Sequence, residues 1–450
     1  MNKLNASKSP LSRRSFLHTA GGAALAFPHV VTAKSPGKKV RVGAVGCGGK
    51  GWTDLNGAAR HADLVAYCDV NVSVNRKGGY NSVKEKWPKA RGYVDWREML
   101  EKESKNLDAV TVSTPDHMHA PVTMTALQLG LGAYTQKPMT RMIQEARAIT
   151  ELAEKKNLPT QMGNQHHSGL GYRTLFEMVR GGAIGKVLTA HSWSNRPVWP
   201  QGIDRPGGSD PVPEGLDWDK WLGVARERPF KKDVYHPFKW RGWFDFGAGA
   251  LGDMGCHIID PVVWLLDLGP AIGVTYEGPK PKPETFPATE VLTYRFAGTE
   301  HTAGDEFVMK WWDGGQRPPK NGSHLPMEAE VPSQGAMFIG EKGTALCPHG
   351  GMPRLWLADK SAKYERPRID RLDHYKVWLD AFHTGEKPNS HFGYAGPLTE
   401  TVLLGVVAAR IGSGKELLWD TQNLRFTNSK EANKHVRPKY RRGWEVEGLG

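Results

Sequence analysis

Short apolar runs alternate with amphipathic stretches over residues 39–156. The apolar runs predict buried strands at 39–45, 64–69, 109–113 and 132–134. Apolar residues three and four positions apart predict helices at 52–60, 72–87, 121–129 and 144–156, and a further helix that ends at 103. Strands that alternate with helices in this way predict a doubly wound parallel sheet.

The pattern changes after residue 160. A helix at 172–180 and a strand at 187–193 precede an insertion rich in Pro, Gly and Trp, at 195–243. Little helix separates the later strand candidates, which lie at 273–277, 289–296, 307–312, 336–339 and 344–346, and two helices follow near 372–383 and 398–411. We therefore expect an α/β domain over 38–159 and an α+β domain with a large, mostly antiparallel open sheet over 160–450.

The N-terminal segment reads SRRSFLHTAGGAALAFPHVVTAKS over residues 12–35. Arg13 and Arg14 precede a weakly apolar stretch rich in Gly and Ala, and small residues follow as far as Ala33. This pattern resembles a twin-arginine export signal, and the alternative is a disordered basic tail. We set residues 1–36 aside from the fold and expect an exported, periplasmic protein.

The distribution of charge, apolar residues and cysteines argues against a nucleic-acid-binding protein, a membrane protein and a disulfide-rich protein. The net charge of the 450 residues is +13, and five of these charges lie in residues 1–36. The rest is spread thinly, with no dense Lys/Arg block, so nucleic acid is not an expected partner. No uninterrupted apolar run approaches 20 residues, so we expect no membrane span in the mature chain. The four cysteines include no CxxC pair and are expected to be free, buried thiols.

A glycine cluster follows the first predicted strand and precedes a helix, as the dinucleotide fingerprint requires. Gly46 allows a tight turn, Gly48 lets the backbone approach a diphosphate, and Gly51 lets the helix pack closely on the strand. The helix N-terminus then offers free N–H groups to the phosphates. The candidate cofactor-binding residues of this turn are Gly46, Gly48, Gly49, Lys50 and Gly51.

Asp69 ends the second predicted strand, 18 residues after Gly51. A carboxylate at this place can hold the hydroxyls of a ribose and would repel a 2′-phosphate, which favours NAD over NADP. Arg76 and Lys77 lie nearby in sequence and keep NADP open. With the glycine turn, the pattern predicts a Rossmann domain that binds NAD.

Two further segments follow strands at the carboxyl edge of the sheet, where ligands bind. The loop STPDHMHAP and the segment YTQKPMT supply the remaining cofactor candidates, which are Ser113, Thr114, Pro115, His117, His119, Gln136 and Lys137. His117 and His119 could ligate a metal, but no matching set of acids or histidines accompanies them, so we expect no metal. Lys137 alone could equally be a surface lysine before a turn.

The segment GALGDMGCHIID places Asp253 and His257 four residues apart, on one face of a helix. Such an aspartate can orient a histidine that accepts a proton. The alternative is a buried, hydrogen-bonded histidine.

Taken in order, GCGGKG, PDHMH, QKP and GALGDMGCHIID resemble the Gfo/Idh/MocA family, the group of glucose–fructose oxidoreductase, inositol dehydrogenase and rhizopine catabolism. The resemblance covers residues 38–450, and segments such as GNQHHS and DWDKWLG resemble its exported branch. It implies that Lys137, Asp253 and His257 converge on the nicotinamide and the reacting carbinol. The family commonly has Glu where this chain has Gln136, which leaves the charge state of Lys137 open.

This resemblance implies an NAD(P)-dependent oxidoreductase that acts on a secondary alcohol of a sugar, glycoside or related polyol. We expect His257 to act as the base, Asp253 to orient it, and Lys137 to polarise the oxygen. Tryptophans of the insertion can stack on sugar rings, although at least half of them should be core residues. The candidate substrate residues are Asn164, Gln165, His166, Arg173, Trp240, Trp243, Asp253 and His257.

The expected export limits how the enzyme can use its cofactor, because free NAD should be scarce outside the cytosol. The cofactor should therefore be held tightly and recycled, either by hydride exchange between sugars or by redox-neutral glycoside cleavage, as in the related glycoside hydrolase family 109. A non-catalytic, NAD-loaded sugar-binding protein is a further alternative. The resemblance also implies a homo-oligomer, a dimer or a tetramer.

Overall fold

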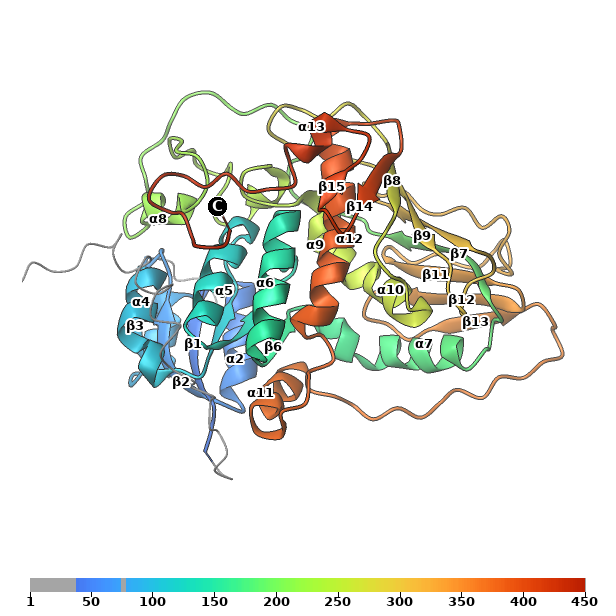
Figure 1. Ribbon diagram of the computed structural model, residues 1–450, viewed down its shortest axis with the longest axis horizontal. Coiled ribbons are helices and arrows are strands. Elements are labelled where there is room, and N and C mark those ends of the chain that lie inside the picture. The colour runs from blue at the N-terminus through green and yellow to red at the C-terminus, as the bar shows by residue number, and fades with distance from the viewer. Residues whose placement is uncertain (1–37, 74–77, 450) are drawn as a thin grey trace, which may run out of the picture.

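The computed structural model describes residues 38–73 and 78–449, which form two sheets with helices packed against them (Figure 1). The predicted export signal, Arg76 and Lys77 lie outside the described residues. The first sheet is wholly parallel, with the strand order β3-β2-β1-β4-β5-β6. Its strands are β1 (Arg41–Val45), β2 (Asp63–Cys68), β3 (Arg91–Tyr93), β4 (Ala109–Val112), β5 (Gly132–Thr135) and β6 (Thr160–Met162).

The predicted doubly wound sheet is thus confirmed, and its strand order reverses between β1 and β4. The accompanying helices are α2 (Lys50–Ala59), α3 (Tyr80–Lys86), α4 (Trp96–Glu103), α5 (His119–Gln128) and α6 (Ile143–Lys156). β6 pairs with β5 and extends the sheet past the boundary expected at 159. Its sequence, Thr-Gln-Met, has no apolar run, so nothing in the pattern marked it as a strand.

The second sheet has nine strands in the order β13-β12-β11-β7-β10-β9-β8-β14-β15. Only the β7–β10 pair is parallel, so the expected large, mostly antiparallel sheet is confirmed. The strands are β7 (Val187–Trp193), β8 (Gly273–Glu277), β9 (Val291–Ala297), β10 (Glu306–Trp312), β11 (Gly335–Gly340), β12 (Gly343–Pro348), β13 (Arg354–Leu357), β14 (Leu417–Asp420) and β15 (Arg425–Phe426). The other helices of residues 170–433, apart from α11 (His374–Thr384), are α7 (Leu170–Arg180), α8 (Trp218–Leu222), α9 (Gly249–Ile258), α10 (Asp260–Leu266), α12 (Phe392–Ile411) and α13 (Lys430–Asn433).

α12 is the central helix of the molecule and packs against α6 of the first domain and α9 of the second (Figure 1). The sequence predicted its start at 398, but Pro397 lies inside its second turn, where it removes one helical hydrogen bond without ending the helix. Among the described helices, α12 alone has the length and composition of a membrane span. Because 83% of its most apolar window is buried within the structure, it serves this fold as a core helix.

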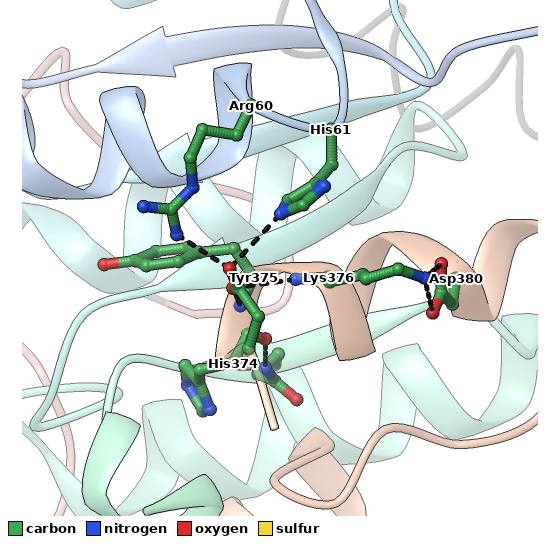
Figure 2. Close-up of polar contacts among 8 residues, drawn as sticks. Arg60, His61, His374, Tyr375, Lys376 and Asp380 are labelled. Carbon is green, nitrogen blue, oxygen red and sulfur yellow. Dashed lines mark hydrogen bonds and ion pairs between the residues drawn. The ribbon is translucent and has the colours of Figure 1, made fainter. Parts of the chain in front are cut away.

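A helix from the end of the chain completes the first domain. α11 (His374–Thr384) packs Tyr375 and Trp378 against a cluster that includes residues of β1 and α2. Asp373 caps α11 by accepting hydrogen bonds from the N–H groups of its first turn, and it pairs with Arg60 at 2.8 Å and His61 at 3.2 Å (Figure 2). The first domain is therefore built from two separate stretches of chain.

Candidate functional site

A cavity of about 610 Å³ lies at the carboxyl edge of the first sheet, where the strand order reverses. The loops that follow β1, β2, β4 and β5 line it, together with part of the Trp-rich insertion. Thirteen of the predicted site residues line this cavity: Gly46, Gly48, Gly49, Lys50, Asp69, Ser113, Thr114, Pro115, His119, Gln136, Lys137, Trp240 and Asp253.

The glycine turn is open to a ligand at Gly48 and Gly49 and is closely packed at Gly51. A Cβ added to Gly48 or Gly49 would meet no atom within 4 Å, whereas one added to Gly51 would lie 2.1 Å from the carbonyl oxygen of Gly46. Gly46 has a φ of 84°, a conformation that favours glycine. α2 begins after Gly49 without a side-chain cap, so its N-terminus remains available to an anion.

Asp69 lies at the end of β2 and faces this turn. Its carboxylate accepts hydrogen bonds from the backbone N–H groups of Cys47 at 2.8 Å and Asn71 at 3.0 Å. Burial raises its pKa, and these N–H donors oppose the shift. An acid next to an open glycine turn and an uncapped helix is the donor set that a dinucleotide requires, so these residues fit NAD.

Lys137 and Asp253 meet at the edge of the cavity. The Nζ of Lys137 lies 2.9 Å from Oδ1 of Asp253 and 2.5 Å from its backbone oxygen. The Nε of Arg241 lies 3.2 Å from the same Oδ1. Burial opposes ionisation of Asp253, but the charges and hydrogen bonds of Lys137 and Arg241 prevail and lower its pKa.

This arrangement corrects the expected role of Asp253. Among the residues that the structure describes, its carboxylate pairs with Lys137 and Arg241, and the Nδ1 of His257 is buried with no hydrogen-bond partner. The helix places Asp253 and His257 on one face, as predicted, but two cations outcompete a neutral imidazole for the carboxylate. Desolvation and the charge of Lys137 hold the pKa of His257 well below its usual value.

Asp116 and Arg241 are among the cavity residues that were not predicted. Asp116 is buried and accepts a hydrogen bond from the N–H of Ala248 at 3.1 Å, and burial raises its pKa to about 7 against the charges of Arg241 and Lys137. Its place between the candidates of the STPDHMH loop could have marked it. Arg241 stacks over Trp240 with 4.2 Å between guanidinium and ring centre, and no spacing in the sequence indicated it.

Of the two predicted loop histidines, His119 lines the cavity and His117 lies outside its lining. His117 is buried with its ring nitrogens near the carbonyl oxygens of Phe246 and Trp221, and His119 faces those of Pro138 and Thr114. Both rings are therefore held by the backbone.

Trp243 is also away from the cavity, in the core of the insertion, where its Nε1 donates to the carbonyl oxygen of Val234. Arg173 donates to the backbone oxygen of Asp370, so the structure does not bring it to the site as predicted. Asn164, Gln165, His166 and His257 lie beyond the cavity lining, on the side of the second domain.

Comparisons with known proteins agree with this geometry. Residues 40–164 match a model described as an oxidoreductase family with an NAD-binding Rossmann fold, and residues 188–302 match the C-terminal alpha/beta domain of the same family. An alpha-N-acetylgalactosaminidase of Shewanella oneidensis is 28% identical over 155 residues, which are 33% of each chain. A glycosyl hydrolase family 109 protein of Shewanella baltica is 27% identical over the same length and shares. The matched stretch thus spans about a third of these curated relatives.

Solved structures are similar over a longer stretch but with lower identity. The WlbA dehydrogenase of Bordetella pertussis, in complex with NADH and UDP-GlcNAcA, has a TM-score of 0.59 and 17% identity, over 85% of this chain and 99% of that one. An NAD-binding protein of Listeria innocua has a TM-score of 0.57 and 15% identity, over 85% of this chain and 100% of that one. At these identities the likeness shows a shared fold.

Proposed function

Because this chain belongs to the Gfo/Idh/MocA oxidoreductase family, we propose that it oxidises a secondary alcohol of a sugar, glycoside or related polyol, with NAD held tightly in the cavity. One observation carries the proposal: Lys137 and Asp253 form an ion pair in the same cavity that the glycine turn and Asp69 line. A sugar substrate is supported by the relatives, one named an alpha-N-acetylgalactosaminidase and one solved with UDP-GlcNAcA.

In the proposed reaction, separate residues bind the cofactor, stabilise the carbinol oxygen and accept its proton. The glycine turn, the N-terminus of α2 and Asp69 would hold NAD, which supplies the acceptor for a hydride from the carbinol carbon. The ion pair with Asp253 holds the Nζ of Lys137 in place, so the lysine can donate a hydrogen bond to the carbinol oxygen and stabilise its developing negative charge. His257 lies one helical turn from Asp253, is neutral, and has an unpartnered Nδ1 that can accept the hydroxyl proton.

Redox-neutral glycoside cleavage is the second candidate, and the similarity to glycosyl hydrolase family 109 proteins favours it. It needs the same oxidation at one carbon, followed by elimination of the aglycone and by reduction of the product. Oxidation is therefore common to both candidates, and the fate of the glycosidic bond separates them.

The experiment that tests the proposal begins with mass spectrometry of the purified protein for retained NAD. A panel of chromogenic glycosides is then scored for keto products and for released aglycone. Keto product without aglycone supports the oxidoreductase, and aglycone without net NADH supports cleavage. A protein that retains no NAD and changes no glycoside would overturn both.

Two further parts of the proposal concern location and assembly. We propose export by the twin-arginine route, from the pattern around Arg13 and Arg14. We also propose a homo-oligomer that pairs the open face of the second sheet, where Val308 of β10 is 36% exposed. Cell fractionation with an Arg13→Lys, Arg14→Lys variant tests the first part, and light scattering tests the second.

A further inference from the structure

Three histidines from separate segments pack against one another, on the side of the site that the second domain forms. His166 comes from the short helix Gln165–Ser168, His257 from α9, and His349 from the turn between β12 and β13. Their ring centres lie 4.4 Å apart for His166 and His349, 5.2 Å for His257 and His349, and 5.7 Å for His166 and His257. We call these three residues the histidine cluster.

The loop that carries His349 is shaped for this contact. Gly350 has a φ of 74°, and a Cβ there would lie 3.1 Å from Cε1 of His166. A Cβ on Gly171, at the start of α7, would lie 1.9 Å from the carbonyl oxygen of Gly351. Glycines at these places therefore let the loop press His349 onto His166. The hydroxyl of buried Tyr172 lies 3.2 Å from Nδ1 of His349 and fixes the orientation of that ring.

Most ring nitrogens of the histidine cluster form no hydrogen bond with the described residues. Within residues 38–73 and 78–449, Nδ1 of His349 is the one ring nitrogen of the three with a protein hydrogen bond. His257 is 5% exposed, and its Nδ1 is buried without a partner. Nδ2 of Asn164 and Oε1 of Gln165, next to His166 in sequence, are also buried without partners. A buried polar atom without a partner costs about 1–3 kcal/mol, so several in one region indicate a ligand that supplies the partners.

The chemistry of the cluster selects the kind of ligand. Burial lowers the pKa of all three histidines, that of His349 to about 3, so each ring is neutral and offers one donor and one acceptor. In the described part of the chain, no group of three His, Cys, Asp or Glu side chains is arranged to hold a metal ion. Neutral imidazoles and carboxamides that both donate and accept match hydroxyl groups, which do the same.

The histidine cluster also lies near Lys137 and Asp253. His257 is one helical turn from Asp253, and the charge of Lys137 acts on both His257 and His349. We propose that the histidine cluster is a hydroxyl-binding subsite for the sugar carbons that flank the oxidised carbinol, and that His349 determines specificity there. This inference rests on the proposed function, whose catalytic group His257 it shares.

The test compares His349→Ala and the milder His349→Asn with the wild type, and His324→Ala serves as a control outside the cluster. Each protein is loaded with NAD, and its NAD content is measured. Methyl β-glucoside and methyl β-galactoside, with their 2-deoxy and 4-deoxy analogues, are the probes. We expect the His349 variants to keep NAD, to raise KM about tenfold or more with kcat changed less than about threefold, and to lose discrimination against the deoxy analogues. Unchanged KM and unchanged discrimination would overturn the subsite.

A wild type that turns over none of these probes would count against the proposed function, and calorimetric binding of the same glycosides then tests the subsite by itself. Weaker binding by both His349 variants, but not by His324→Ala, would support it. Equal binding, or no binding by the wild type, would overturn it. Loss of activity on dialysis against a chelator, with recovery on adding zinc, would also overturn it in favour of a metal centre.

Discussion

The side-chain amide of Gln136 donates a hydrogen bond of 2.8 Å to the carboxylate of Asp54, a fully buried residue of α2. That carboxylate also accepts from the hydroxyl groups of Ser113 and Tyr375 and pairs with Lys50 at 2.9 Å. A glutamate at position 136, which is common in the family, would face Asp54 with a second negative charge. The amide therefore suits Asp54, and Asp253 supplies the negative charge beside Lys137.

Gln136→Glu should destabilise the protein at neutral pH, because it places two carboxylates within hydrogen-bond distance in a buried site. We expect a loss of about 3 kcal/mol in the free energy of unfolding, since an unpaired buried charge costs about that much. Urea unfolding at pH 7 and pH 5 measures it, and part of the loss should be recovered at pH 5, where one carboxyl can be protonated. Gln136→Met, which removes the hydrogen bond without adding a charge, should lose less. Equal losses at both pH values would contradict this explanation.

Lys137→Met should reduce turnover at least about 100-fold, because it removes the donor that stabilises the developing alkoxide. NAD should remain bound, since the glycine turn and Asp69 are unchanged. The measurement is kcat on the best glycoside together with the NAD content of the purified protein. The exposed Lys155→Met serves as the control and should match the wild type. A variant that lost NAD as well as activity would instead assign Lys137 to cofactor binding.

A double-mutant cycle can decide which partner Asp253 serves. Because Asp253 pairs with Lys137, the losses from Asp253→Asn and Lys137→Met should be strongly non-additive in kcat. His257→Ala should by itself lower turnover at least about 100-fold while NAD is retained, and its effect should combine more nearly additively with that of Asp253→Asn. Non-additivity between Asp253 and His257 alone would restore the aspartate–histidine pair that the sequence suggested.

The sequence predicted the elements that depend on local pattern. Strands β1, β2, β4 and β5 of the first sheet, the glycine turn and Asp69 follow from apolar runs and from a motif of fixed spacing, and the structure brings them together. Arg241 and His349 could not be predicted, because Arg241 lies on a short 3-10 helix of the insertion and His349 on a turn, and the positions of both segments depend on tertiary packing. Spacing placed Asp253 correctly on its helix but could not reveal its partner, which lies 116 residues away in sequence.

Asp373→Ala should loosen α11 from the first domain, because Asp373 both caps the helix and pairs with Arg60 and His61 (Figure 2). Loss of an N-cap alone costs about 1 kcal/mol, so we expect a destabilisation of about 1–2 kcal/mol by urea unfolding. Asp380→Ala on the same helix removes an exposed pair with Lys376 and should cost less than about 0.5 kcal/mol. Similar losses in the two variants would mean that the cap and its pairs do not secure α11.

Glu290 and Asp313 form a buried carboxyl pair at the joined ends of β9 and β10. Oδ1 of Asp313 accepts a hydrogen bond from the N–H of Glu290 at 2.8 Å, and Oδ2 accepts one from the indole of Trp311 at 3.2 Å. Burial and the neighbouring carboxyl raise the pKa of Glu290 well above its usual value, and burial raises the pKa of Asp313 to about 7. The folded protein therefore holds protons at this pair that the unfolded chain releases near pH 4.

A raised pKa in the folded state stabilises the protein at low pH, so this contribution should be full below about pH 4 and should be lost as pH rises through about 7. We expect the free energy of unfolding to fall between pH 5 and pH 7, with a slope that approaches about 1.4 kcal/mol per pH unit for each proton released. Asp313→Asn should flatten this slope, because its amide keeps the neutral state at every pH, whereas Asp305→Asn at an exposed site should retain it. Urea unfolding from pH 5 to pH 8 measures the three proteins. If wild type and Asp313→Asn differ by the same free energy throughout that range, the pair does not hold its proton as the burial and contacts of Asp313 imply.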